Sequence, residues 1–520
     1  MNKPTTLAEL LASGYESHSV KEEMRRNLIA KLRNREPLFP GILGYEDTVT
    51  PQLVNAILAK HDVILLGLRG QAKTRIARLL IELLDEWTPI VKGSEINDDP
   101  THPISYHAVQ LIRELGDATP IEWIHRSERY GEKLATPDVT IADIIGDIDP
   151  LKAAHQRLHY SHEGAIHFGI IPRTNRGIFT INELPDLQPR IQVGLFNLLE
   201  ERDIQIRGFN IRIPLDVMMV FTANPEDYTN RGNIITPLKD RIASQILTHY
   251  PLSMETAISI TEQEAWTARF GEEGLAVPRY FKEIIEQIAF EARKSEFIDQ
   301  KSGVSARLTI SAMEALISNA ERRSIMNGDD IILPRVTDLA FVTTGVTGKV
   351  ELVFEGEQEG MAKVARALIG KAVREIFKKY FPDPMVRERV KSGTERYQDR
   401  YAKTGQPQQP QKEGEYDAVL NWFSQGNMIS ITDTMKFDDY AKELSRVPRL
   451  RELTVRHLKI QEADRFSLAS AMEFVLDGLH QNSKLAKEEE FGRPDVTYRD
   501  MIGSIFTRPV ISEEDEDFTA

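Results

Sequence analysis

The chain has 520 residues with 41% hydrophobic and 28% charged residues, which predicts a soluble globular protein of two to four domains. It contains no cysteine, and this excludes disulfides, thiolate metal sites and cysteine nucleophiles. The net charge of −14 argues against a large nucleic-acid footprint, because phosphate contacts need a clustered excess of Lys and Arg.

The N-terminal part is expected to be helical and to precede the main domain. No run of residues approaches the roughly 20 apolar positions of a membrane span, and residues 1–5 lack a signal peptide's apolar core, so we expect a cytoplasmic protein without membrane contact. The spacing of residues 5–35 predicts a helix, and Pro37 should end it. An apolar loop over 38–45 follows, and we expect a helix over 50–60.

Residues 63–74 carry the strongest motif. Four apolar residues, 63–66, predict a strand that is buried on both faces, and the following loop leads into a helix over 75–84. Such a loop can cradle phosphate, with Lys73 reaching the terminal phosphates and the Thr74 hydroxyl binding magnesium. The strict pattern has glycine where this chain has Ala72, and an ordinary strand-to-helix turn is the alternative. The predicted phosphate-contacting residues are Gly67, Leu68, Arg69, Gly70, Gln71, Ala72, Lys73 and Thr74.

The stretch 88–135 is irregular, and from it we predict only one strand of the main sheet, ending near residue 140. A loop over 151–175 then holds histidines. They could ligate zinc, although histidines that face solvent or a partner are the commoner case. The four histidines are His155, His159, His162 and His167.

A second strong signal is the apolar strand 177–183, which ends in an acidic residue. Its carboxyl end should meet the phosphate loop at one edge of a parallel sheet, where Glu183 could act as general base on a water. Asn182 takes the place where an aspartate would hold magnesium, and an amide brings no charge to offset the cation. Hydrolysis would then be slow, or another carboxylate such as Asp186 would help.

The predicted βα series continues to about residue 252. It comprises a helix over 188–201, a hairpin over 203–213, an apolar strand over 217–223 and a strand over 246–250. The amide of Asn224, directly after the third of these, could hold the attacking water.

The second half of the chain is predicted to be mostly helical. A lid over 253–385 contains Arg307 in the first turn of an amphipathic helix, an unfavourable place for a cation that hints at a function. Residues 350–354 suggest a strand before an acidic loop. Residues 386–415 should be a flexible linker, and 416–520 a helical domain with an acidic tail.

In their order along the chain, these motifs resemble AAA+ ATPases of the magnesium-chelatase ATPase subunit and MoxR group. The resemblance covers roughly residues 36–385 and includes the phosphate loop, Asn182-Glu183, residues 222–226 and the Leu-x-Asp-Arg motif at 238–241. It implies an α/β fold, an AAA+ P-loop core with a parallel five-stranded sheet, followed by a helical lid and a C-terminal helical extension. The implied domains are 1–35, 36–252, 253–385, the linker 386–415, and 416–520.

The resemblance also implies ATP and Mg²⁺ as cofactors and assembly with itself into a ring, expected to be a hexamer. Asn224 corresponds to sensor 1, Arg241 to the arginine finger given to a neighbouring subunit, and Arg307 to sensor 2. The apolar loop with Ile42 and Leu43 is well placed to wrap the adenine ring, and a plain packing loop is the alternative. The partner would be a protein client or a protein with a von Willebrand A domain.

Two other functions stay open at this point. One is a nucleic-acid-directed motor or transcriptional activator, which the acidic balance disfavours. The other is a nucleotide-binding switch with little turnover, which Asn182 favours.

Overall fold

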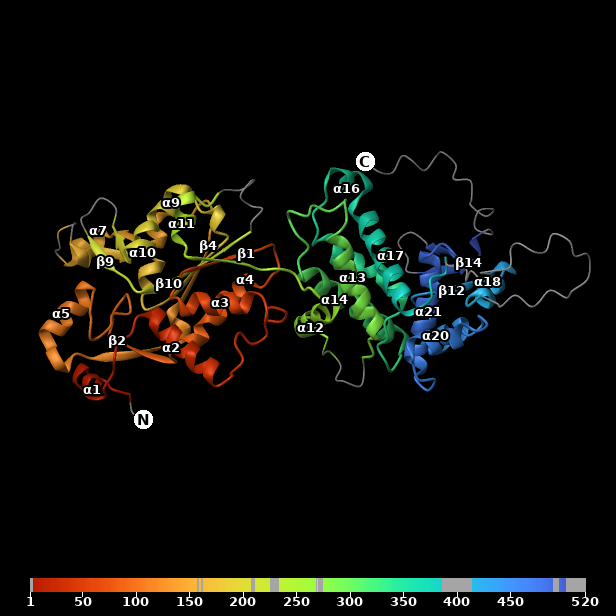
Figure 1. Cartoon of the computed structure of the whole chain (residues 1–520), viewed down its shortest axis with the longest axis horizontal. Coiled ribbons are helices and arrows are strands. Elements are labelled where there is room, and N and C mark those ends of the chain that lie inside the picture. Colours follow the sequence, from red (N-terminus) through yellow and green to blue (C-terminus); the bar gives the residue numbers. More distant parts are fainter. Residues whose placement is uncertain are drawn as a thin grey trace, which may run out of the picture. The chain divides into compact units, whose positions relative to one another are not determined.

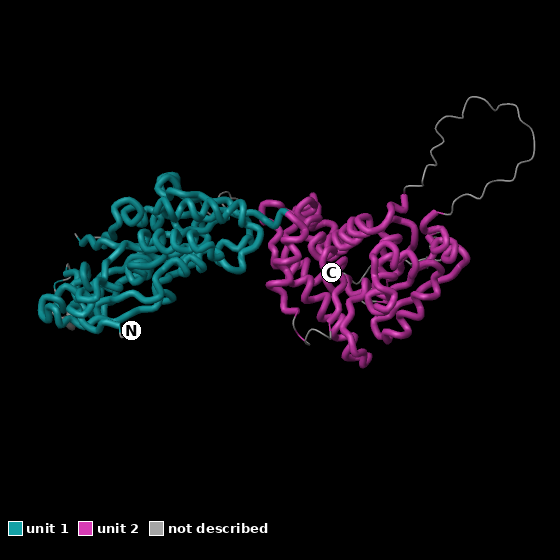
Figure 2. Tube along the Cα trace, turned by 60° about the horizontal axis from the view of Figure 1, so that its bottom comes forward, with its two compact units in different colours: residues 1–252 teal, residues 253–520 magenta. Residues whose placement is uncertain are grey.

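The computed structural model describes residues 3–156, 159, 162–206, 211–224, 233–267, 269, 275–385, 414–489 and 495–501. Two compact units divide the chain, residues 1–252 and residues 253–520 (Figure 2). Within the described ranges, no helix combines the length and the hydropathy that a membrane crossing requires.

The first unit is built on a five-stranded sheet in the order β11-β1-β10-β7-β4, with every neighbouring pair parallel. The strands are β1 (Val63–Leu66), β4 (Tyr130–Leu134), β7 (Gly177–Asn182), β10 (Val217–Ala223) and β11 (Ser244–Leu247). The predicted α/β class with a parallel five-stranded sheet is therefore confirmed, and β1, the strand that precedes the phosphate-loop motif, lies inside the sheet between β11 and β10.

Helices cover both faces of this sheet (Figure 1). Along β1, Val63 and Leu65 pack into one hydrophobic cluster and Ile64 and Leu66 into another, so the strand is buried on both sides. The helices described in this unit are α1 (Leu7–Ala12), α2 (Val20–Arg33), α3 (Val49–Leu58), α4 (Lys73–Leu79), α5 (Tyr106–Leu115), α6 (Ile141–Ile144), α7 (Pro150–Gln156), α8 (Ile170–Arg173), α9 (Pro189–Gly194), α10 (Phe196–Glu200) and α11 (Thr236–Arg241).

Three short antiparallel pairs are attached to this core. They are β2 (Trp87–Val91) with β3 (Ile121–His125), β5 (Gly146–Ile148) with β6 (Ile166–Phe168), and β8 (Asp203–Gln205) with β9 (Arg212–Pro214). The last pair confirms the predicted hairpin, whose residues 207–210 lie outside the described part of the chain.

Three details of the sequence prediction for this unit are wrong. The main-sheet strand expected near residue 140 is β4, which ends at Leu134, because β2 and β3 form a separate ribbon before it. The N-terminal segment forms two helices rather than one, since Ser19 caps a new helix with Glu22. The final strand begins at Ser244 and ends at Leu247 instead of covering 246–250.

The second unit is mainly helical and has one hydrophobic core cluster, to which residues on both sides of position 400 contribute. Its helices are α12 (Met254–Glu264), α13 (Arg279–Ala292), α14 (Arg307–Asn327), α15 (Leu339–Thr347), α16 (Phe354–Glu359), α17 (Met361–Tyr380), α18 (Asp417–Ser424), α19 (Phe437–Leu444), α20 (Leu450–Leu458) and α21 (Arg465–Gln481). An antiparallel sheet in the order β12-β14-β13 completes it, formed by β12 (Ile429–Ile431), β13 (Ala486–Glu489) and β14 (Val496–Arg499).

The prediction of a strand at 350–354 is wrong. Leu352 forms only an isolated bridge with Ile298, and the acidic residues that follow belong to α16 instead of a loop. The small C-terminal sheet was not predicted at all. The predicted linker, apart from residues 414 and 415, and the acidic tail lie outside the described residues.

A buried carboxyl in the second unit leads us to expect that its stability depends on pH. Glu286 on α13 is 4% exposed and lies against the hydroxyl of Thr261, and burial raises its pKa from 4.5 to about 7. Because the folded pKa is the higher one, its contribution to stability is complete below pH 4.5 and is lost as the pH rises through about 7.

We therefore expect Glu286→Gln to be more stable than the wild type at pH 8, by up to about 3 kcal/mol, and no more stable at pH 4. Urea unfolding of the full chain at both pH values, followed by hydrogen exchange in peptides from α13, measures this. The exposed Glu262, paired with Lys282, provides the control Glu262→Gln, which should change stability by less than about 1 kcal/mol. Equal destabilisation by Glu286→Gln at both pH values would contradict the prediction.

Candidate nucleotide site

The loop between β1 and α4 has the backbone shape of an anion cradle. Gly70 and Ala72 both adopt left-handed conformations, with φ of 74° and 56°. Alternation of this kind turns successive N–H groups toward one side, where they can meet an anion. A left-handed alanine is strained in a way that glycine is not, and such strain is kept where the surrounding structure enforces it.

Close packing holds this loop against β11. A Cβ atom at Gly67 would lie 1.9 Å from Oγ1 of Thr248 and 2.2 Å from Oε1 of Gln71, so any other residue there would displace these two side chains. The Thr248 hydroxyl lies 2.7 Å from Oε1 of Gln71, and the Tyr45 hydroxyl donates to the Gln71 carbonyl at 3.0 Å. Tyr45 thereby connects the loop containing Ile42 and Leu43, which are both half-buried, to the cradle.

Lys73, the first residue of α4, is the cation of the cradle. Its side chain is largely buried, with 8% of the residue exposed, and Nζ donates to the carbonyls of Gly67 and Leu68, the latter at 3.0 Å. The ammonium group therefore lies over the loop that would enclose a phosphate.

The carboxyl ends of β7 and β10 lie beside this loop. Oδ1 of Asn182 accepts from the hydroxyl of Thr222 at 3.1 Å and from that of Thr74 at 3.4 Å. The backbone N–H of Gly67 donates to the carbonyl of Ala223 at 3.1 Å, which places Asn224, 3% exposed, next to the cradle.

Glu183 follows Asn182 in a left-handed conformation, with φ of 54° and ψ of 51°. Its N–H donates to the Thr222 hydroxyl at 3.2 Å, and its half-buried side chain starts at the same sheet edge. Non-glycine residues in this conformation cluster at functional sites, since the strain needs a reason to persist.

The structure adds a residue that the sequence analysis missed. Glu132 on β4 accepts a hydrogen bond from Nδ2 of Asn182 at 2.7 Å and forms a two-pronged ion pair with Arg78 of α4, at 2.8 and 3.0 Å. Burial raises its pKa, but the hydrogen bonds and charge of Arg78 outweigh this and leave the pKa below its usual value. A correct assignment of β4, with its alternating polar residues, would have placed this carboxylate at the site.

Arg241 contacts residues outside this cluster. Arg241, at the end of α11, donates to Glu200 at 2.9 Å and lies 4.6 Å from the ring centre of Phe196. Arg307 belongs to the second unit, where it is exposed and opens α14.

The histidine loop offers no zinc site in the described part of the chain, where no group of three or more His, Asp or Glu side chains is arranged to hold a metal. His162 packs edge-on against Tyr106 at 4.5 Å instead, and His167 lies on β6. The side chain of His155 is outside the described residues, as are Pro225 and Glu226.

The donor set fits a magnesium nucleotide. Magnesium prefers oxygen ligands, and the hydroxyl of Thr74 and the amide oxygen of Asn182 lie 3.4 Å apart at the start of α4, beside the cradle. The buried ammonium of Lys73 and the N–H groups of the loop suit the phosphates.

No protein-family model and no curated protein matches this chain. Among solved structures, it is similar to the complex of magnesium chelatase subunits BchI and BchD, with 17% identity over 62% of this chain and 99% of that chain and a TM-score of 0.32. It is also similar to NtrX from Brucella abortus in complex with ATP, with 13% identity over 68% of this chain and 68% of that chain and a TM-score of 0.34. The structure of Hsp104 with ATPγS and casein has 12% identity over 58% of this chain and 48% of that chain, with a TM-score of 0.36.

Proposed function

We propose that this chain is an ATP-hydrolysing AAA+ motor of the magnesium-chelatase and MoxR type. One observation carries the proposal, namely that Lys73, Thr74, Asn182, Glu183 and Asn224 come from three strand ends and meet at one edge of the sheet. The resemblance of the motif order in the sequence supports the same conclusion.

Each residue then has a distinct chemical task. Lys73 neutralises charge on the terminal phosphates, while Glu183 accepts a proton from the attacking water and Asn224 orients that water. Thr74 and Asn182 would hold magnesium, which neutralises phosphate charge when bound.

We further propose that the active form is a ring of identical subunits, with six as the expected number. In that arrangement Arg241 would leave Glu200 and reach the nucleotide of a neighbour, while Arg307 would act from the lid. A cation supplied in trans makes hydrolysis depend on assembly, because it stabilises charge that grows in the transition state.

The partner that the motor would act on is a protein client or a protein with a von Willebrand A domain. The hairpin over 203–213 and the loop over 151–175 are the proposed contact elements. A nucleic-acid partner is disfavoured by the net charge of −14.

A second candidate function is a nucleotide-binding switch with little turnover. Asn182 favours it, since this amide stands where a charged residue would strengthen the hold on magnesium. The two candidates differ in the rate of hydrolysis and share the binding site.

Lys73→Ala tests what both candidates share. We expect it to weaken ATP binding by about 10- to 100-fold, because hydrogen bonds to a charged group are lost from a buried site. Fluorescence titration with a labelled ATP analogue measures this. Lys60→Ala is the matched control, since Lys60 is exposed and pairs with Glu22; equal affinity in both variants would refute the proposed site.

A further inference from the structure

The amide of Asn182 has a defined orientation. Its oxygen faces the hydroxyls of Thr74 and Thr222, and its NH₂ group donates to Oε1 of Glu132 at 2.7 Å. If the amide were turned around, Oδ1 of Asn182 would face Oε1 of Glu132, and two acceptors would meet. The hydrogen-bond network therefore determines which amide atom is the oxygen and which is the nitrogen. The oxygen is therefore the atom presented toward Thr74.

Glu132 reaches Asn182 because of the parallel register of β4 and β7. Glu132 pairs with Thr180, and Leu134 pairs with Asn182, so the carboxylate reaches along the sheet toward the carboxyl ends by two residue pairs. Positions 180 and 182 lie on the same face of β7, since side chains alternate along a strand.

Other contacts fix the carboxylate in place. Arg78 binds both of its oxygens, and the Tyr130 hydroxyl donates to Oε2 at 3.1 Å. The side chain of Glu132 is 23% exposed while that of Arg78 is 62% exposed, so the carboxylate is the better shielded partner. Its charge therefore acts on Asn182 at close range and with less screening than a surface charge.

We propose that Glu132 supplies from the neighbouring strand the negative charge that position 182 lacks. This inference rests on the proposed nucleotide site. Glu132 is a positioning residue: its hydrogen bond holds the Asn182 oxygen toward Thr74 and polarises the amide, so that the oxygen is a better acceptor. The pair Glu132–Asn182 thus takes the place of a single aspartate. Asn182 would contact the cation, and the Glu132 carboxylate would act on the cation only through its hydrogen bond to Asn182.

Exchanging the two groups tests this idea. We expect Glu132→Gln to raise the Mg²⁺ concentration needed for half-maximal binding of a labelled ATP analogue by about 10-fold, the usual effect of losing an outer partner of a metal ligand. Binding of the same analogue in EDTA should stay at the wild-type level, because the cradle is untouched.

Asn182→Asp alone should bring no improvement, because it sets a second carboxylate against Glu132. The double variant Glu132→Gln/Asn182→Asp restores one acid and one amide in exchanged positions, and we expect its Mg²⁺ dependence to return to within about threefold of the wild type. Glu82→Gln, which removes a surface carboxylate paired with Arg126, serves as the control and should leave the Mg²⁺ dependence unchanged.

A merely structural role for Glu132 predicts a different outcome. In that case the double variant would be at least as impaired as Glu132→Gln, and that result overturns the inference, as does a wild-type Mg²⁺ dependence in Glu132→Gln. Failure of the proposed site itself is recognised separately, since Lys73→Ala would then bind the analogue in EDTA as well as the wild type does.

Discussion

Glu183→Gln is expected to bind ATP as well as the wild type does and to hydrolyse it at least about 100-fold more slowly. A general base typically contributes 10²–10⁴-fold to the rate, and the amide can still accept a hydrogen bond from water but cannot take up its proton. Single-turnover hydrolysis, measured beside equilibrium binding of the same nucleotide, separates the chemical step from binding.

Two other acids make the result specific. Glu201→Gln alters an exposed residue just past α10 and should retain the wild-type rate. Asp186→Asn should also retain most of it. If Asp186→Asn loses the rate and Glu183→Gln keeps it, the base is Asp186 and the assignment of Glu183 is wrong.

The same pair of measurements decides between motor and switch. A motor requires a wild-type rate that Glu183→Gln abolishes, whereas a switch with little turnover has a low rate that Glu183→Gln barely changes. Because both forms bind nucleotide, the affinity of Lys73→Ala does not separate them.

The central strands were predictable because burial on both faces leaves an unambiguous pattern. The run 63–66 is fully apolar, and 217–223 is apolar except for Thr222. Their short length and the glycine and turn residues beside them favour buried strands over helices. The phosphate-loop motif and the acid at the end of β7 then follow from their positions on such strands.

Elements at the margin of the sheet were not predictable in the same way. β4 is an edge strand with mixed burial, and its sequence Tyr-Gly-Glu-Lys-Leu resembles a loop as much as a strand. Glu132 was missed for this reason, since only the register of β4 with β7 brings its carboxylate to Asn182. The prediction for residues 350–354 failed in the opposite direction. Their alternating pattern is typical of a strand, but Leu352 has only an isolated bridge to Ile298, and Phe354, which is 69% exposed, begins α16.

The left-handed conformations of Ala72 and Glu183 could not be read from residue type at all. Both residues prefer right-handed or extended backbone, and only the packing around the cradle imposes the alternative. The network around Arg129 is equally invisible in the sequence, because its members are separated by up to 106 positions.

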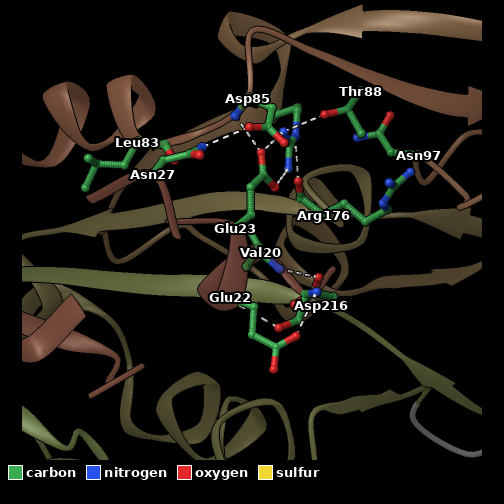
Figure 3. A network of polar contacts seen from close by, with 12 residues as sticks. Val20, Glu22, Glu23, Asn27, Leu83, Asp85, Thr88, Asn97, Arg176 and Asp216 are labelled. Carbon is green, nitrogen blue, oxygen red and sulfur yellow. Dashed lines mark hydrogen bonds and ion pairs between the residues drawn. The ribbon is translucent and has the colours of Figure 1, made fainter. Parts of the chain in front are cut away.

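Arg129 holds α2, the second helix of the chain, onto the sheet. It is 1% exposed, and its guanidinium donates to both carboxylate oxygens of Glu23, at 2.7 and 2.6 Å, to Thr88 at 2.6 Å and to the carbonyl of Arg176 at 2.7 Å. Glu23 also accepts from the N–H of Asp85 at 2.6 Å (Figure 3). Both carboxylate oxygens of Glu23 therefore accept hydrogen bonds, and the guanidinium of Arg129 donates four, which offset the cost of burying the ion pair.

Arg129→Met should accordingly destabilise the first unit by about 3–5 kcal/mol, because it leaves the carboxylate of Glu23 buried without its counter-charge. Arg126→Met is the matched control from the same turn, since Arg126 and its partner Glu82 are 27% and 41% exposed and should contribute less than about 1 kcal/mol. Urea-dependent hydrogen exchange in peptides of α2 and β4 measures both variants in the full chain. Adding Glu23→Leu to Arg129→Met should recover part of the loss, because the unpaired charge is then gone; a loss in Arg129→Met no larger than in Arg126→Met would mean that the buried pair does not anchor α2.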